Sequence, residues 1–227
     1  MKINLTTTDY LRIGILVLVF VAGITGSYFI LKPEERLPIY NPSNLDRRLV
    51  AEDLRQVGMN HQVLPFNLVN QFGDSISEAV VEDKIYVADF FFTVCPDICK
   101  DMAVQKRRLQ EVMKDEEDFV ILSHSVTPVM DSVPVIKAYA DLQGAIPGKW
   151  HILTGDKPQI YNLARRSYFA IFDQGGKGDE ADFIHTENFI LVDKEKRIRG
   201  FYDGTSEEEV DRLIEDYQIL KAEYQQD

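Results

Sequence analysis

Two cysteines, Cys95 and Cys99, are the residues of this 227-residue chain whose type and spacing most directly predict chemistry. They are its only cysteines, and they bracket the pentapeptide CPDIC. On a helix, residues i and i+4 share one face, so both sulfurs would converge on one point. The N-terminus of a helix also stabilises a thiolate. Two soft, anionic sulfurs favour Cu(I) or Zn(II), whereas a disulfide closing so short a loop would add little stability.

A buried strand and the helix after it must position these cysteines. Residues 84–93 (KIYVADFFFT) are aromatic, β-branched and nearly all apolar, a pattern that predicts a central strand buried on both faces. Apolar residues then recur at helical spacing over 96–114, which places the cysteines at the start of a helix. The carboxyl-terminal edge of the strands is where open α/β sheets place their sites.

The other predicted elements complete one domain around this unit. Apolar patterns predict further strands at 63–69, 119–126, 150–153, 183–192 and 197–202, and helices at 132–142, 156–166 and from 206 onward. A strand leads directly into a cysteine-bearing helix within the order β-α-β-α-α-β-β-α. This order predicts an α/β fold with a thioredoxin-like central mixed sheet flanked by helices.

A dithiol needs a further ligand to complete a copper site, and the chain has four histidines that could supply it. His185 stands at the entry of the predicted late hairpin, which faces the first turn of the cysteine helix in a thioredoxin-like fold. Topology therefore favours His185, although a loop histidine that only makes hydrogen bonds is an equally good interpretation. His61 lies in or just after a linker, while His124 and His151 lie within or beside predicted strands, where structural roles are expected.

At these residues the chain resembles the Sco/SenC family of copper proteins. The family's CPDIC motif after a Phe-rich strand stands here at 92–99 (FTVCPDIC), and the family's distal His-Thr or His-Ser is matched by His185 and Thr186. The resemblance covers most of residues 62–220. It also includes SVTP at 125–128, KAYA at 137–140, WHILTG at 150–155 and FILVD at 189–193.

The resemblance implies a copper ion held by Cys95, Cys99 and His185, bound both as Cu(I) and as Cu(II). It implies a metallochaperone, a binding protein rather than an enzyme, that helps to assemble the binuclear copper centre of cytochrome c oxidase. The partner would be the copper-acceptor subunit of the oxidase or another copper chaperone.

A thiol–disulfide oxidoreductase that reduces the cysteines of a copper-site partner is the alternative. Cys95 would then attack the partner's disulfide and Cys99 would resolve the mixed disulfide. Two features count against a general enzyme of this kind. The spacing is C-x3-C rather than C-x-x-C, and no proline follows Pro158, whereas such enzymes carry a cis-proline before the late hairpin.

The N-terminal part of the chain predicts a single transmembrane helix over residues 12–32. The 19 residues from Ile13 to Leu31 include no charged residue, and as a helix they would span roughly 28 Å, the hydrocarbon thickness of a bilayer. A cleaved signal peptide is the alternative, but the apolar run is longer than the usual signal core and no clear small-x-small cleavage site follows it.

The predicted anchor divides the chain into four parts. Residues 1–11 form a cytoplasmic tip, 12–32 the anchor, 33–61 a proline-containing linker, and 62–227 the thioredoxin-like domain. No transit peptide is visible. We therefore expect a bacterial inner membrane protein with a single span and its C-terminal domain in the periplasm.

The charge of the chain excludes one class of function. The formal net charge is −12, and most of the acidic residues lie beyond the N-terminal region. An acidic body repels a phosphate backbone, so we expect no nucleic acid partner.

Overall fold

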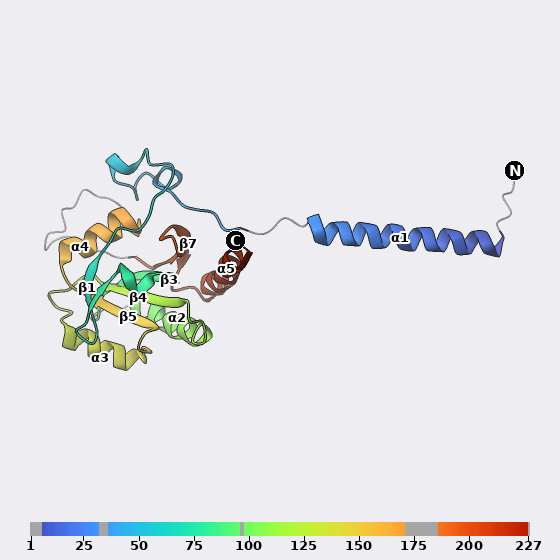
Figure 1. Cartoon of the computed structure of the whole chain (residues 1–227). Coiled ribbons are helices and arrows are strands. Elements are labelled where there is room, and N and C mark those ends of the chain that lie inside the picture. Colours follow the sequence, from blue (N-terminus) through green and yellow to red (C-terminus); the bar gives the residue numbers. More distant parts are fainter. Residues whose placement is uncertain (1–5, 32–35, 96–97, 171–185, 227) are drawn as a thin grey trace. The chain divides into compact units, whose positions relative to one another are not determined.

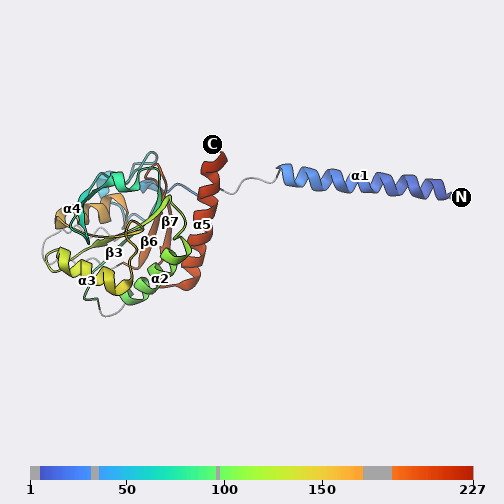
Figure 2. The ribbon, with the colours of Figure 1, turned by 60° about the horizontal axis from the view of Figure 1, so that its bottom comes forward.

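A computed structural model of the chain describes residues 6–31, 36–95, 98–170 and 186–226. The chain divides into two compact units, Met1–Glu35 and Arg36–Asp227. The second unit holds both cysteines and the whole sheet, and its ribbon is seen from two sides in Figure 1 and Figure 2.

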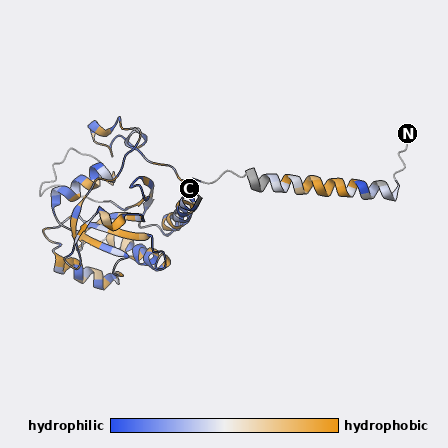
Figure 3. Ribbon diagram, viewed as in Figure 1, coloured by the Kyte–Doolittle hydropathy of each residue, from blue (hydrophilic) through white to orange (hydrophobic). Residues whose placement is uncertain are grey.

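The described part of the first unit is one long helix, α1 (Thr7–Leu31). Figure 3 shows apolar residues along the middle of this helix, where the uncharged run of the sequence lies. Among the residues that the structure describes, however, no helix combines the length and the apolar character needed to cross a bilayer. The transmembrane anchor expected over 12–32 is therefore not found there.

A mixed sheet forms the centre of the second unit, as the sequence predicts. In the described residues it has the strand order β2-β1-β5-β4-β3-β6-β7. The central strands β3, β4 and β5 run parallel, and the outer pairs are antiparallel. The strand bounds are β1 (Asn67–Asn70), β2 (Ser75–Ser77), β3 (Ile85–Phe91), β4 (Phe119–Ser125), β5 (Trp150–Thr154), β6 (Asn188–Val192) and β7 (Ile198–Asp203).

Helices flank this sheet, with α2 and α3 along one face and α4 along the other (Figure 1, Figure 2). The last helix, α5, packs on β7 and against α2, and Ser206 Oγ accepts a hydrogen bond from Glu209 N at 3.3 Å, which caps its start. The helix bounds are α2 (Ile98–Val112), α3 (Val133–Gln143), α4 (Lys157–Asn162), continued by a π-helical turn (Leu163–Ser167), and α5 (Glu207–Gln226). Short 3₁₀ turns occur at Pro42–Asn44, Glu52–Leu54 and Glu78–Val81.

The two central strands confirm the prediction made from their apolar runs. Every residue of β3 and β4 is buried, and the strands pair in parallel from Ile85 opposite Phe119 to Phe91 opposite Ser125. Both strands therefore end at the same edge of the sheet. The cysteine segment follows β3 at that edge, and the loop that begins at Val126 follows β4.

Residues 36–61 pack on the domain, although their composition predicts a linker. Tyr40 forms a bridge with Ile198 of β7, with a backbone N–H···O distance of 2.9 Å. The buried Arg199 guanidinium donates to the carbonyl oxygens of Leu37 at 2.8 Å and Pro38 at 3.1 Å. An arginine about 160 positions downstream thus satisfies the backbone of this segment, a contact that local composition does not reveal.

Candidate metal centre

The two thiols that the sequence singles out lie together in the fold. Cys95 and Cys99 are both free, 8% and 7% exposed, and their side chains are hydrogen-bonded to each other. Cys95 lies four residues after the end of β3 at Phe91, and Cys99 lies in the first turn of α2. The two side chains meet as expected, but Cys95 lies before the start of α2 at Ile98, so a shared helix face is not the reason.

The charge state of Cys99 differs from the expectation. Burial raises the pKa of the Cys99 thiol to about 12, and the hydrogen bond with Cys95 adds to this rise. A hydrogen bond with the Phe92 backbone and the charge of Lys106 lower the pKa, but by less. The expected anionic sulfur at this position is therefore wrong for the metal-free protein, because desolvation of the buried thiolate outweighs the stabilising contacts. Cys99 is a neutral thiol at pH 7.

A buried carboxylate fixes the backbone just before Cys95. Asp131 is fully buried and accepts hydrogen bonds from the Thr93 backbone N–H at 3.2 Å and from Thr93 Oγ1 at 2.5 Å. It also accepts from Ser125 Oγ at 2.6 Å and Thr127 Oγ1 at 2.9 Å. One carboxylate thus joins the ends of β3 and β4. Sequence reasoning missed Asp131, although two hydroxyl residues at alternate positions after a buried strand were a usable signal.

A buried ion pair lies further along the cysteine helix. Lys106 of α2 and Asp89 of β3 are both fully buried, with Nζ 2.6 Å from Asp89 Oδ2 and 3.2 Å from Ser123 Oγ. Ser123 Oγ donates to Asp89 Oδ1 at 2.5 Å and accepts from Trp150 Nε1 at 2.8 Å. Sequence reasoning missed this cluster as well.

The three described histidines are placed as structural residues. His124 stacks on Phe90 with ring centroids 5.0 Å apart, its Nδ1 lies 3.2 Å from the carbonyl oxygen of Asp89, and burial lowers its pKa to about 4. His61 Nε2 lies 2.9 Å from the carbonyl oxygen of Ser167. Burial also lowers the pKa of His61 and His151.

His185, the third expected ligand, lies outside the described residues. Within the part of the chain that the structure describes, no group of three or more histidine, cysteine or acidic side chains could hold a metal ion. Two free thiols in mutual contact do fit a soft cation such as Cu(I), which thiolates bind in preference to oxygen ligands. The described residues thus supply two sulfur donors.

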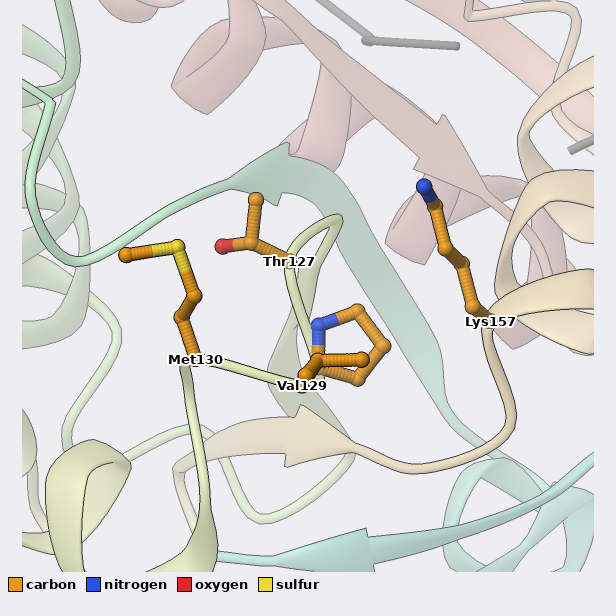
Figure 4. Close-up of a pocket in the computed structure, with 5 residues that line it drawn as sticks. Thr127, Val129, Met130 and Lys157 are labelled. Atoms are coloured by element: carbon orange, nitrogen blue, oxygen red, sulfur yellow. The ribbon is translucent and has the colours of Figure 1, made fainter. Parts of the chain in front are cut away.

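A small pocket opens on the loop that Asp131 holds. It is lined by Thr127, Pro128, Val129, Met130 and Lys157 and has a volume of about 170 Å³. Figure 4 shows Met130 and Lys157 on opposite sides of it, with Thr127 between them. Val129 and Met130 are 87% and 61% exposed. Apolar side chains thus project into solvent from the loop that is hydrogen-bonded to the cysteine segment.

The fold and the site define a class of protein: a thioredoxin-like domain with a buried dithiol at the carboxyl end of a central strand. The SCO1/SenC family profile matches residues 42–220. The SCO1 protein homolog of Bacillus subtilis is 31% identical over 160 residues, covering 70% of this chain and 82% of that protein. The chain belongs to the SCO1/SenC family.

Solved structures agree with this assignment. BsSco, described as a member of the Sco family of cytochrome c oxidase assembly proteins with a disulfide switch, superposes with a TM-score of 0.60. It is 29% identical and covers 71% of this chain and 94% of its own. Copper-bound ScoI of Arabidopsis thaliana superposes with a TM-score of 0.53 at 25% identity, over 71% of this chain and 98% of its own.

Proposed function

We propose that this protein is a copper metallochaperone that helps to assemble the binuclear copper centre of cytochrome c oxidase. The observation that carries the proposal is the contact between two free, buried thiols at the end of β3. Soft sulfur donors at this spacing suit Cu(I). The copper bound to Arabidopsis ScoI and the assembly role given for BsSco support the same function.

His185 is the proposed third ligand, since the family resemblance of His185 and Thr186 supports it. A neutral imidazole beside two thiolates would allow both Cu(I) and Cu(II) to bind. Such a three-ligand site leaves one side of Cu(I) open to an incoming thiolate. The ion can then pass to the acceptor through shared-ligand intermediates, without being released into water. The acceptor is the copper-receiving oxidase subunit or a second copper chaperone.

Copper titration of the full chain, followed by X-ray absorption, tests this proposal. We expect two sulfurs and one nitrogen around Cu(I), and loss of tight binding in Cys95→Ser, Cys99→Ser and His185→Ala. His151→Gln is the matched control, because it removes a buried imidazole of β5 and should leave the affinity unchanged. Full Cu(II) affinity in His185→Ala would remove this histidine from the ligand set.

Attachment to a bacterial inner membrane, with the domain in the periplasm, completes the proposal. The uncharged run Ile13–Leu31 supports it. Carbonate extraction of membranes from cells that produce the chain gives the test, with a variant lacking residues 1–32 as control. Recovery of the full chain in the soluble fraction would contradict this part of the proposal and leave the copper site untouched.

Thiol–disulfide exchange is the second candidate, favoured by the contact between the thiols and by the disulfide switch described for BsSco. Cys95 would attack a partner disulfide and form a mixed disulfide. Cys99 would then attack the Cys95 sulfur, which releases the partner in its dithiol form and leaves a Cys95–Cys99 disulfide in this chain. The high pKa of Cys99 slows that second step. Rapid turnover of a generic disulfide substrate by the full chain would favour this function over metal transfer.

A further inference from the structure

One face of α2 carries both the cysteine Cys99 and the buried lysine Lys106, and the proposed function does not connect the two. Its buried residues include Cys99, Met102, Ala103 and Lys106, so Lys106 follows Cys99 by two helical turns on the face that meets the sheet. Side chains of a helix lean toward its N-terminus. The Lys106 ammonium therefore extends toward the cysteines.

The surroundings of this ammonium extend to the cysteine segment. Nζ lies 5.0 Å from the centre of the Phe91 ring and 5.3 Å from that of Trp150, and it is paired with Asp89 at 2.6 Å. Phe91 is followed in the chain by Phe92, whose carbonyl oxygen accepts from Cys95 N at 3.4 Å and whose backbone also bonds to Cys99. A buried cation thus contacts the ring of Phe91, and the next residue, Phe92, is the one whose backbone bonds to both cysteines.

Copper binding creates a charge that this location must accommodate. Cysteine binds a metal ion as the thiolate. Two thiolates and a neutral imidazole then carry a net charge of −1 with Cu(I) and zero with Cu(II). Because the sulfurs are buried, that additional negative charge is poorly solvated by water. A nearby fixed cation lowers the free energy of the Cu(I) form more than that of the Cu(II) form.

We propose that Lys106 is a positioning residue of the copper site, whose buried ammonium compensates the anionic sulfurs and biases the site toward Cu(I). Asp89 and Ser123 hold the ammonium in place, and Asp89 tempers its field. This inference rests on the proposed function, and it assigns a role to a buried ion pair that metal ligation does not use. The electrostatic influence of Lys106 on Cys99 supports it.

A pair of single substitutions with opposite electrostatic effects tests the proposal. Lys106→Met removes the cation at nearly constant length, and Asp89→Asn removes the anion that opposes it. Both leave a buried partner without its counter-charge, so both should lower the stability of the fold. Their effects on the bound metal should differ in sign. We expect the ratio of Cu(I) to Cu(II) affinity to fall about tenfold in Lys106→Met and to rise in Asp89→Asn.

The measurement is a competition titration of the full chain with each ion, together with voltammetry. A tenfold change in the ratio is 59 mV for a one-electron couple. Gln110→Met is the matched control. Gln110 is a buried polar residue of the same helix that bonds to Gly144 O at 3.0 Å and Ile146 N at 2.7 Å, so its loss should destabilise the fold and leave the ratio unchanged.

If the ratio of Cu(I) to Cu(II) affinity changed in the same direction in both variants, or by less than twofold, the ion pair would be only structural. A readout without metal separates this inference from the proposed function. The alkylation rate of Cys99 in the metal-free chain should fall in Lys106→Met and rise in Asp89→Asn. If the wild-type chain bound no copper, the proposed function would fail, and the alkylation rates would still decide whether Lys106 acts on the sulfurs.

Discussion

Asp131→Asn should destabilise the domain by about 2–3 kcal/mol, because Asp131 is a fully buried acceptor for four hydrogen bonds. The asparagine amide keeps one oxygen. That oxygen can take the position of Oδ2 and accept the three hydrogen bonds that Oδ2 accepts. Each retained bond then changes from charge-assisted to neutral, a loss of about 1 kcal/mol apiece. Burying an uncharged amide costs less free energy than burying a carboxylate, and this difference offsets part of the loss from the weakened hydrogen bonds.

Urea denaturation of the metal-free chain measures this loss as a shift of the midpoint at constant slope. Asp141→Asn is the matched control, since Asp141 is an exposed carboxylate of α3 paired with Lys137 at 2.5 Å, and such pairs contribute under about 1 kcal/mol. Thr93→Val removes one donor of the network, and the double variant should show a coupling of about 1 kcal/mol with Asp131→Asn. Additive effects, or a loss for Asp131→Asn no larger than the control, would refute the shared-acceptor reasoning.

Three further predictions follow from buried charges and thiols. His124 is neutral in the fold, with a pKa lowered from 6.5 to about 4 by burial. Only the unfolded chain binds its proton as the pH falls from 6.5 to 4, so about 3 kcal/mol of stability should be lost over that range. His124→Phe should flatten the curve, and an unchanged curve would contradict the assignment. In Cys95→Ser, alkylation of Cys99 should accelerate about tenfold per pH unit with no plateau up to pH 10, whereas a plateau near pH 8 would contradict the raised pKa. Arg199→Met should cost about 2–3 kcal/mol, because it removes the arginine that pairs with the part-buried Glu223 and one of the two arginines that pair with the buried Asp193. It should also expose residues 36–40 to proteases, and unchanged protection of that segment would contradict the packing.

The sheet was predictable because its central strands carry their signal locally. The apolar runs that become β3 and β4 leave no polar face, so only a doubly covered position suits them. The same reasoning correctly assigns His124 a structural role, since a histidine inside such a run is enclosed wherever the strand lies. The contact between Cys95 and Cys99 was expected from a shared helix face, but Cys95 lies before α2, which begins at Ile98, so helical geometry alone does not set it.

Lys106 could not be found in this way, because its partners Asp89 and Ser123 lie on other elements, 17 residues away in the sequence. Lys106 begins a basic run with Arg107 and Arg108, which locally predicts a solvated helix face. It is buried because its ammonium donates hydrogen bonds to Asp89 of β3 and Ser123 of β4. An unpaired charge is costly to bury. A charged residue is therefore predicted to be exposed to solvent unless its partner can be identified from the sequence.

The protonation of Cys99 follows the same logic and changes how the site must work. Helix position is a local property and favours the thiolate, whereas desolvation depends on everything packed around the sulfur and here dominates. In the proposed copper site, Cys99 would have to release its proton to bind the ion, so the copper affinity should rise with pH. Under our proposal the Lys106 ammonium compensates the resulting charge, while the Asp131 carboxylate holds the backbone at Thr93, just before Cys95.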